Sequence, residues 1–195
     1  MKNSETNKVF HNLPTLKTKR LILRKLKMSD ACDIYEYGRD PLVSRYTIWA
    51  RHKSIKDTRG FLKYVQREYR KAVPESWGMI LKENGKLIGT CGFNNYNSNF
   101  RKAEIGYAMS RKYWGKGLMT EAVEAMLDFG FGKLKLNRIC AHCMIDNKGS
   151  EKVMKKCGMK FEGIMREGIF VKGKPRDLKM YAILKKEWLK TVSRI

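Results

Sequence analysis

Apolar residues recur with two different periods along this chain, and the changes of period separate predicted strands from predicted helices. Alternating or continuous apolar runs bounded by turn residues are typical of strands. Such runs predict strands over residues 20–26, 77–82, 86–93, 103–109, 137–144, 160–169 and 176–184. Asn84-Gly85 joins the second and third of these and indicates a tight antiparallel hairpin.

Apolar residues spaced three and four positions apart predict helices over residues 29–37, 54–74, 118–130 and 147–157. Ser29, Ser54 and Asn147 are the predicted N-caps, because their side-chain oxygens can accept hydrogen bonds from the unpaired N–H groups of a first turn. Pro74 and Gly158 are the predicted stops of the second and fourth helices.

The order of these elements predicts the fold class. Antiparallel strands come first and a strand–helix–strand unit follows, so the sheet is predicted to be mixed. We expect an N-terminal extension at residues 1–15 and a single α/β (α+β) domain at residues 16–190. Its twisted sheet should have about seven strands, with helices on both faces.

Charge and hydropathy narrow the possible partners. Lys+Arg number 42 and Asp+Glu 19, which gives a formal charge of 42 − 19 = +23, spread from Lys2 to Arg194. Such a charge suggests an acidic partner such as nucleic acid, a ribosome, an anionic membrane surface or a polyphosphate cofactor, and a basic, soluble surface is the alternative. The chain has neither the apolar core of a signal peptide nor a membrane-spanning run, so we expect a cytoplasmic protein without stable membrane association.

The cysteines predict free thiols and no metal site. There are 5, an odd number at irregular spacing, which fits a reducing compartment. Cys140-Ala-His-Cys143 has no second pair at zinc-like spacing, so it is predicted to be part of a buried strand.

Two glycines stand just before the third predicted helix, in Arg111-Lys-Tyr-Trp-Gly-Lys-Gly-Leu-Met-Thr-Glu-Ala122. Gly115 and Gly117 allow backbone N–H groups to turn inward, and the following helix adds unpaired N–H groups and the positive end of its dipole. Lys112 and Lys116 add positive charge. The stretch has the features of a phosphate cradle, although a plain turn before a helix has the same pattern.

The cradle and its neighbours together resemble the GNAT N-acetyltransferase superfamily. A Glu-Ile-Gly-Tyr strand at 104–107, the Gly-x-Gly turn, a helix, a second strand and Asn147-x-x-Ser150 follow one another in the family's order. The chain looks closest to the ribosomal-protein alanine N-acetyltransferase branch, and the resemblance spans roughly residues 16–188. It implies transfer of acetyl from acetyl-coenzyme A to a primary amine.

The resemblance also implies where coenzyme A is held. Strands 105–109 and 138–144 should part and leave a gap for the pantetheine arm, and the loop amides should hold the pyrophosphate. Lys112 replaces the family's usual Gln or Arg, which keeps the charge but not the bidentate geometry. The residues expected at the cofactor are Tyr107, Met109, Lys112, Gly115, Lys116, Gly117, Leu118, Met119, Asn147, Ser150 and Lys156.

The reaction needs a base that takes a proton from the acceptor's ammonium group. Glu104 is one candidate, and we expect a partly apolar cleft to raise the pKa of its carboxyl toward 7; an exposed strand charge is the alternative. His142 is the second candidate, because some relatives carry a catalytic Glu near this position and imidazole titrates in the right range. A packed strand histidine is the alternative.

Two further groups follow from the chemistry. The developing oxyanion needs a donor, and the backbone N–H near Met109, freed by a strand bulge, is the one the resemblance implies. Many relatives have a proton-donating Tyr or Ser where this chain has Met154, which cannot donate a proton. Either another group, such as Tyr181 or a water, protonates the departing thiolate, or coenzyme A leaves as the thiolate.

The leading functional prediction is an acetyl-coenzyme A-dependent N-acetyltransferase of the ribosomal-protein type. Its acceptor would be a protein N-terminal α-amine, which attacks directly in a ternary complex, and a homodimer is possible. Acetylation of a small amine such as a polyamine or aminoglycoside is an alternative that acidic residues at the acceptor mouth would favour. A non-catalytic module that binds RNA or a ribosome is the other alternative.

Overall fold

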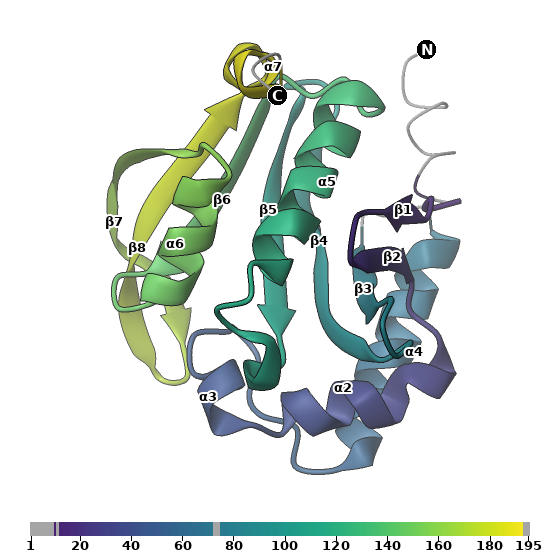
Figure 1. Cartoon of the computed structure of the whole chain (residues 1–195). Coiled ribbons are helices and arrows are strands. Elements are labelled where there is room, and N and C mark those ends of the chain that lie inside the picture. The colour runs from purple at the N-terminus through teal and green to yellow at the C-terminus, as the bar shows by residue number, and fades with distance from the viewer. Residues whose placement is uncertain (1–9, 11, 72–74, 193–195) are drawn as a thin grey trace.

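Eight strands form one open sheet in the order β1-β2-β3-β4-β5-β6-β8-β7 in the computed structural model, which describes residue 10 and residues 12–71 and 75–192 (Figure 1). The strands are β1 (Leu16–Lys17), β2 (Leu21–Lys25), β3 (Ser76–Leu81), β4 (Leu87–Asn97), β5 (Lys102–Met109), β6 (Arg138–Met144), β7 (Lys160–Val171) and β8 (Lys174–Leu184). The helices are η1 (Met28–Asp30), α2 (Ala31–Gly38), α3 (Pro41–Ser44), α4 (Ile55–Arg70), η2 (Arg111–Tyr113), α5 (Leu118–Gly132), α6 (Lys148–Lys156) and α7 (Lys185–Val192).

The predicted fold class is confirmed. All the predicted strands are present, and β5 and β6 form a parallel pair among antiparallel neighbours, so the sheet is mixed. β3 and β4 are antiparallel neighbours, as the hairpin signal predicts, and Gly85 has a φ of +69° in the turn between them. The strand that the sequence did not predict is β1, whose two residues are too few to show a period.

The helix predictions hold with one correction. Ser29 is not the N-cap of the first helix, because it lies inside the short turn η1. Asp30 organises this corner: its carboxylate accepts from the Lys27 N–H at 2.7 Å and from both terminal nitrogens of Arg24. Pro74, the predicted stop of the second helix, lies outside the described residues.

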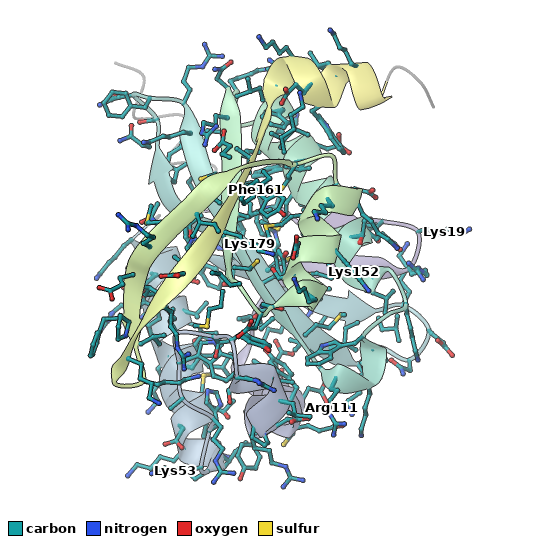
Figure 2. The ribbon with its side chains drawn as sticks, turned by 90° about the vertical axis from the view of Figure 1, so that its left-hand side faces the viewer. Lys19, Lys53, Arg111, Lys152, Phe161 and Lys179 are labelled. Atoms are coloured by element: carbon teal, nitrogen blue, oxygen red, sulfur yellow. The ribbon has the colours of Figure 1, made fainter. Side chains whose placement is uncertain are left out.

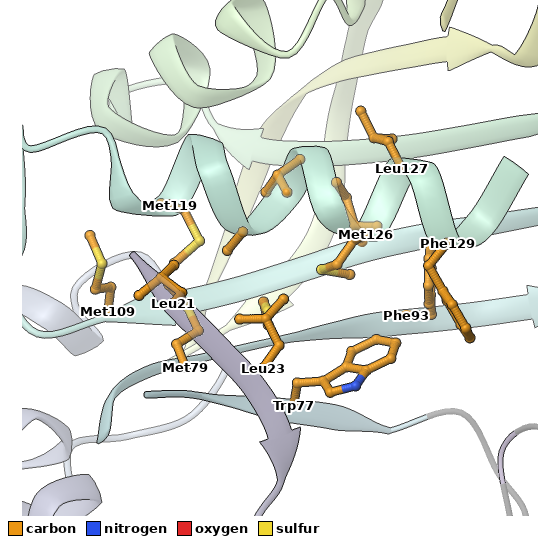
Figure 3. Packing of buried hydrophobic residues seen from close by; sticks show 14 of the residues in the cluster. Leu21, Leu23, Trp77, Met79, Phe93, Met109, Met119, Met126, Leu127 and Phe129 are labelled. Carbon is orange, nitrogen blue, oxygen red and sulfur yellow. The ribbon is translucent and has the colours of Figure 1, made fainter. Parts of the chain in front are cut away.

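Large apolar side chains pack between the sheet and α5 (Figure 3). The predicted apolar face of α5 is buried, including Met119, Met126 and Leu127. The Trp77 ring meets Phe129 edge-on at 5.5 Å between centroids, and its indole nitrogen donates to the Pro14 carbonyl at 2.7 Å. This packing fixes α5, and therefore the loop at its start, against the middle of the sheet.

Helices cover both faces of the sheet. In Figure 1, α5 and α6 lie in front of β4, β5 and β6, while α4 lies behind β2 and β3. The short helices α2 and α3 lie beyond the carboxyl end of β5, next to the loop that leads to α5.

The parallel pair parts soon after it begins. β5 and β6 are paired only over Lys102–Arg138, Ala103–Ile139 and Glu104–Cys140, whereas β4 follows β5 to Met109 and β8 follows β6 to Met144. The two strands therefore diverge toward their carboxyl ends, as Figure 1 shows. The splay implied by the resemblance is present.

Candidate active site

The predicted cradle is a left-handed turn that leads directly into α5. Gly115 and Gly117 have φ values of +76° and +74°, a region that strains residues with a Cβ atom. Gly117 is the N-cap and offers no side chain to the helix N–H groups. The Leu118 and Met119 side chains are buried, so their backbone amides are what the loop can present to a ligand.

Such a donor set fits a diphosphate. Backbone N–H groups converge in a turn of this kind, and the helix start adds partial positive charge. The arrangement can hold the pyrophosphate of coenzyme A without a bidentate side chain at position 112. Lys116 adds positive charge nearby, with its ammonium 5.5 Å from the centre of the Tyr113 ring.

The Lys112 side chain, which the resemblance places at the cofactor, forms an ion pair with a neighbouring helix. Its ammonium pairs with Glu36 of α2 at 2.6 Å, and the side chain is 73% exposed. Arg111 likewise reaches Asp40, at 3.0 Å, just before α3. The two basic residues at the start of the loop therefore tie it to the neighbouring helices.

The N–H of Met109 points toward the gap between β5 and β6. The next amide, Ser110 N–H, donates to the Ile88 carbonyl of β4 at 2.8 Å. Because donors alternate along an antiparallel strand, the Met109 N–H faces the opposite edge, where pairing with β6 has already ended. No bulge is needed: the β4–β5 register is even from Met109 back to Glu104, and the parting of the strands frees this edge.

Polar contacts connect the start of α6 with β5 across the gap. Asn147 is the N-cap as predicted, and its side-chain oxygen accepts from the Ser150 N–H at 3.1 Å. The Ser150 hydroxyl is 2.8 Å from the Tyr107 hydroxyl, and burial raises the pKa of that phenol. Lys156 lies apart from this network, exposed in the last turn of α6.

A buried carboxylate holds α6 against β8. Glu151 accepts from Lys179 at 2.8 Å and from the Tyr181 hydroxyl at 3.0 Å, and Lys155 pairs with it at 2.8 Å. The hydrogen bonds from Lys155, Lys179 and Tyr181 lower the pKa of Glu151 to about 2. The Tyr181 hydroxyl is therefore engaged with Glu151, and Met154 is fully buried in the core.

The two candidate bases, predicted separately, are in contact. His142 Nδ1 lies 3.2 Å from a Glu104 carboxylate oxygen, and both side chains are partly exposed. They lie at the vertex where β5 and β6 part, because Glu104 belongs to the last paired position and His142 follows two residues after its partner. If Nδ1 carries a proton toward Glu104, Nε2 is left as an acceptor, which is the arrangement of an oriented general base.

The contact reverses the predicted pKa of Glu104. Burial raises that pKa, but the hydrogen bond and charge of His142, with a further hydrogen bond from Asn95, outweigh it and lower the value. The hydrogen bond to Glu104 raises the pKa of His142 despite burial. The expectation that the pKa of Glu104 is raised toward 7 is therefore wrong: the contact lowers the pKa of Glu104 and raises that of His142.

A cavity of about 450 Å³ opens at the carboxyl end of β6. Met144, which shares a face of β6 with His142 by alternation, is part of its wall. Charged residues dominate the rest: Asp146, Glu167, Asp177, Arg45 and Arg176. This mixed charge can bind an acceptor that carries an ammonium group together with an anionic or polar group.

The overall charge is spread over the surface. Figure 2 shows basic side chains such as Lys19, Lys152 and Arg111 on separate segments. Within the described residues, no group of three or more His, Cys, Asp or Glu side chains could hold a metal ion. Over the same part of the chain, no helix is long and apolar enough to span a membrane. All five cysteines are free thiols.

A mixed sheet that parts at a parallel pair, with a glycine turn entering a helix at that point, defines an N-acetyltransferase fold. The acetyltransferase (GNAT) domain family matches residues 20–160. The chain belongs to this family and is an N-acetyltransferase that uses acetyl-coenzyme A.

Individual relatives agree with this assignment. The uncharacterized N-acetyltransferase p20 of Bacillus licheniformis is 35% identical over 176 residues, which cover 90% of this chain and 99% of that protein. A crystal structure of a GNAT-family acetyltransferase from Bacillus anthracis has a TM-score of 0.80 and 32% identity, and covers 89% of this chain and 100% of that one. The ribosomal-protein-serine acetyltransferase of Escherichia coli is 31% identical over 134 residues, 67% of this chain and 72% of that protein.

Several residues around the site were not predicted from the sequence. Thr18 and Arg20 contact the cradle helix from the other end of the chain, through Glu121. Arg45, just after α3, and Arg176 of β8 line the cavity. These residues have no local spacing signature, because only the tertiary fold brings them to the site.

Proposed function

We propose that this N-acetyltransferase acts on the N-terminal α-amine of a protein, of the ribosomal-protein type, in the cytoplasm. The relative that carries the proposal is the ribosomal-protein-serine acetyltransferase, at 31% identity. The open cavity at the end of β6 supports it, because a chain terminus can enter while the rest of the acceptor stays outside. The basic charge of +23 suits an acceptor that is part of an RNA-rich particle.

In this proposal, backbone amides of residues 115–119 hold the diphosphate of acetyl-coenzyme A, and Tyr107, Asn147 and Ser150 border its pantetheine arm. Acetyl-coenzyme A supplies an activated acetyl thioester. The amides of the loop are preorganised by the two left-handed glycines, so they lose little conformational freedom on binding. Lys112, Lys116 and Lys156 contribute charge at the rim.

The proton-accepting group in this proposal is His142 Nε2, oriented by Glu104 through Nδ1. The acceptor enters as an ammonium ion and must become a free amine before its nitrogen can form the new bond to the acetyl carbon. The thioester C–S bond breaks as coenzyme A departs as a thiolate, and the second proton of the nitrogen passes to that thiolate or to water. His142 takes that proton, and Glu104 stabilises the imidazolium that results. The Met109 N–H, which faces the gap, donates to the oxygen on which negative charge develops.

The acceptor is tested with purified protein, acetyl-coenzyme A and a peptide panel, read out as thiol release and as peptide mass. Peptides that begin with Ala or Ser and carry ribosomal-protein N-terminal sequences form one arm, and the same peptides with a blocked α-amine form the control. We expect acetylation only where the α-amine is free. Acetylation of lysine side chains in the blocked peptides would contradict the proposed acceptor.

A small cationic amine is the second candidate acceptor. Asp146, Glu167 and Asp177 line the cavity and can bind an ammonium group, although Arg45 and Arg176 share the same wall. The panel therefore includes a polyamine and an aminoglycoside. A kcat/KM for either that exceeds the best peptide value would favour this candidate.

A further inference from the structure

An arginine from the N-terminal part of the chain donates a hydrogen bond to the backbone of the cradle. Arg20 directly precedes β2, and its terminal Nη1 donates to the Lys116 carbonyl at 2.9 Å, across a sequence separation of 96 residues. Lys116 lies between the two left-handed glycines of the cradle. The contact therefore reaches the segment whose amides would meet the diphosphate.

Arg20, with its contacts to Lys116 and Glu121, forms a clamp on the cradle, and this clamp is anchored at several points. Arg20 Nε donates to Glu121 in α5 at 2.7 Å, and the Arg20 backbone N–H donates to the same carboxylate at 2.6 Å. Thr18 donates its hydroxyl to Glu121 at 2.5 Å, and the Arg20 carbonyl accepts from the Lys82 N–H at 2.9 Å. The guanidinium is thus held by backbone and carboxylate contacts, although its side chain is 44% exposed.

Peptide geometry gives this contact a direction. In a trans peptide the C=O bond of one residue and the N–H bond of the next lie in a single rigid plane and point in opposite directions. Arg20 draws the Lys116 oxygen to one side, so the Gly117 N–H is directed to the other. Because the φ angle of Gly117 is one of the two dihedrals that set this plane, the plane could otherwise rotate at little cost.

We propose that Arg20 is a positioning residue that holds the Lys116–Gly117 peptide plane so that the Gly117 N–H faces the diphosphate of acetyl-coenzyme A. The inference rests on the proposed cradle, and it adds a determinant of cofactor selectivity from outside the matched loop. Arg20 fits the role better than lysine, because one guanidinium can bond the carbonyl and the Glu121 carboxylate at once. The effect is specific to thioesters that carry the diphosphate.

The test compares acetyl-coenzyme A with S-acetylpantetheine, which has the same thioester and no diphosphate, as donors for the same amine acceptor. The selectivity is the ratio of the two kcat/KM values. Arg20→Ala should lower kcat/KM for acetyl-coenzyme A by about tenfold or more, through KM, and leave the value for S-acetylpantetheine unchanged. Arg20→Lys should fall between wild type and Arg20→Ala.

Arg101→Ala is the matched control. Arg101 is also an exposed arginine that donates to a backbone carbonyl, that of Lys135, at 2.9 Å, but it lies away from the cradle. It should not alter the selectivity. Equal losses with both donors in Arg20→Ala would show that Arg20 only supports the fold, and would overturn the inference. Circular dichroism and thermal melting identify a variant that does not fold, in which case Arg20→Lys carries the test.

Gly117→Ala separates failure of the clamp from failure of the cradle. If wild type shows no preference for acetyl-coenzyme A over S-acetylpantetheine, the proposed cradle is wrong and the inference falls with it. If Gly117→Ala lowers the preference and Arg20→Ala does not, the cradle stands and the clamp is wrong. If both lower it, both are supported.

Discussion

The side of the molecule that we propose for the donor and the side that we propose for the acceptor are built in different ways. On the donor side, a short continuous segment from the end of β5 to the start of α5 offers backbone amides, set by Gly115 and Gly117. On the acceptor side, the segment after α3, the end of β6 and the β7–β8 hairpin bring charged side chains together around a cavity.

The difference separates what is general from what is specific in this enzyme. A diphosphate is the same in every acetyl-coenzyme A molecule, so backbone groups in a fixed geometry are sufficient to bind it. An acceptor varies from one relative to another, and side chains on loops and strand ends can change without disturbing the core. The Glu104–His142 pair lies at the vertex between the two sides, which is where the proposed proton transfer is placed.

The largest expected effect is at that vertex. His142→Gln should lower kcat by about 10²- to 10⁴-fold, since it removes the proposed base, while KM for acetyl-coenzyme A stays near the wild-type value. Steady-state thiol release at saturating donor measures it. The control is His52→Gln, because His52 is also partly buried and hydrogen-bonded, at 2.7 Å to Thr58, but lines a different cavity, between α2 and Lys112. Equal losses in the two variants would remove His142 from the mechanism.

The dependence of the rate on pH tests the pairing. Glu104 raises the pKa of His142, and the imidazole must be neutral to accept a proton, so the rate should fall as pH falls through a value above the ordinary 6.5 or so. Glu104→Gln removes the charge that raises this pKa, and burial then lowers it. The acid limb of kcat/KM should move to lower pH in this variant, with a lower plateau. An unmoved limb would show that another group titrates.

A substitution in the cradle should change KM for acetyl-coenzyme A more than it changes kcat. Gly117→Ala places a Cβ at a φ of +74°, which costs roughly 1–3 kcal/mol of strain, and should raise KM for acetyl-coenzyme A by about tenfold. Gly132→Ala is the matched control at the other end of α5: an added Cβ has open space there, and φ is not positive. Its melting temperature should be unchanged or higher, with normal KM.

The donor side could be predicted from sequence because its parts are local. The left-handed conformations of Gly115 and Gly117 and the N-cap at Asn147 occur next to helix starts, and those starts follow from apolar spacing. Glu104 and His142 were predicted one by one, but their contact depends on the register of the β5–β6 pair. Without that register the partner was unknown, and the sign of the Glu104 pKa shift came out wrong.

The acceptor side could not be predicted in the same way. The cavity joins Arg45, Asp146 and Arg176, which belong to segments far apart in the chain, and no spacing rule connects them. Arg20 presents the same difficulty on the donor side, since its partner carbonyl is 96 residues away. The order β6-β8-β7 at the sheet edge decides which hairpin residues face the cavity, and it is a property of the whole fold.

On the acceptor side, removing a positive or a negative charge from the cavity should weaken binding of oppositely charged peptides, with smaller effects than those in the cradle. Arg176→Gln should raise the acceptor KM about 2- to 5-fold for peptides with an acidic second residue, and Asp146→Asn should do so for peptides with a basic one. KM for acetyl-coenzyme A should not change in either. Lys160→Gln, which removes a charge elsewhere on the same hairpin, is the control. Identical effects on both peptide sets would show that this cavity does not select the acceptor.

The smallest effect is expected where this chain departs from the family pattern. Lys112→Gln introduces a residue usual in relatives, yet Lys112 is 73% exposed and pairs with Glu36, which keeps Lys86 as a second partner. An exposed pair of this kind contributes about 0–1 kcal/mol, so KM for acetyl-coenzyme A should change by less than about fivefold. If Lys112→Gln matched the loss in Gly117→Ala, the cradle would depend on side-chain charge, and the contrast between a backbone-built donor side and a side-chain-built acceptor side would fail.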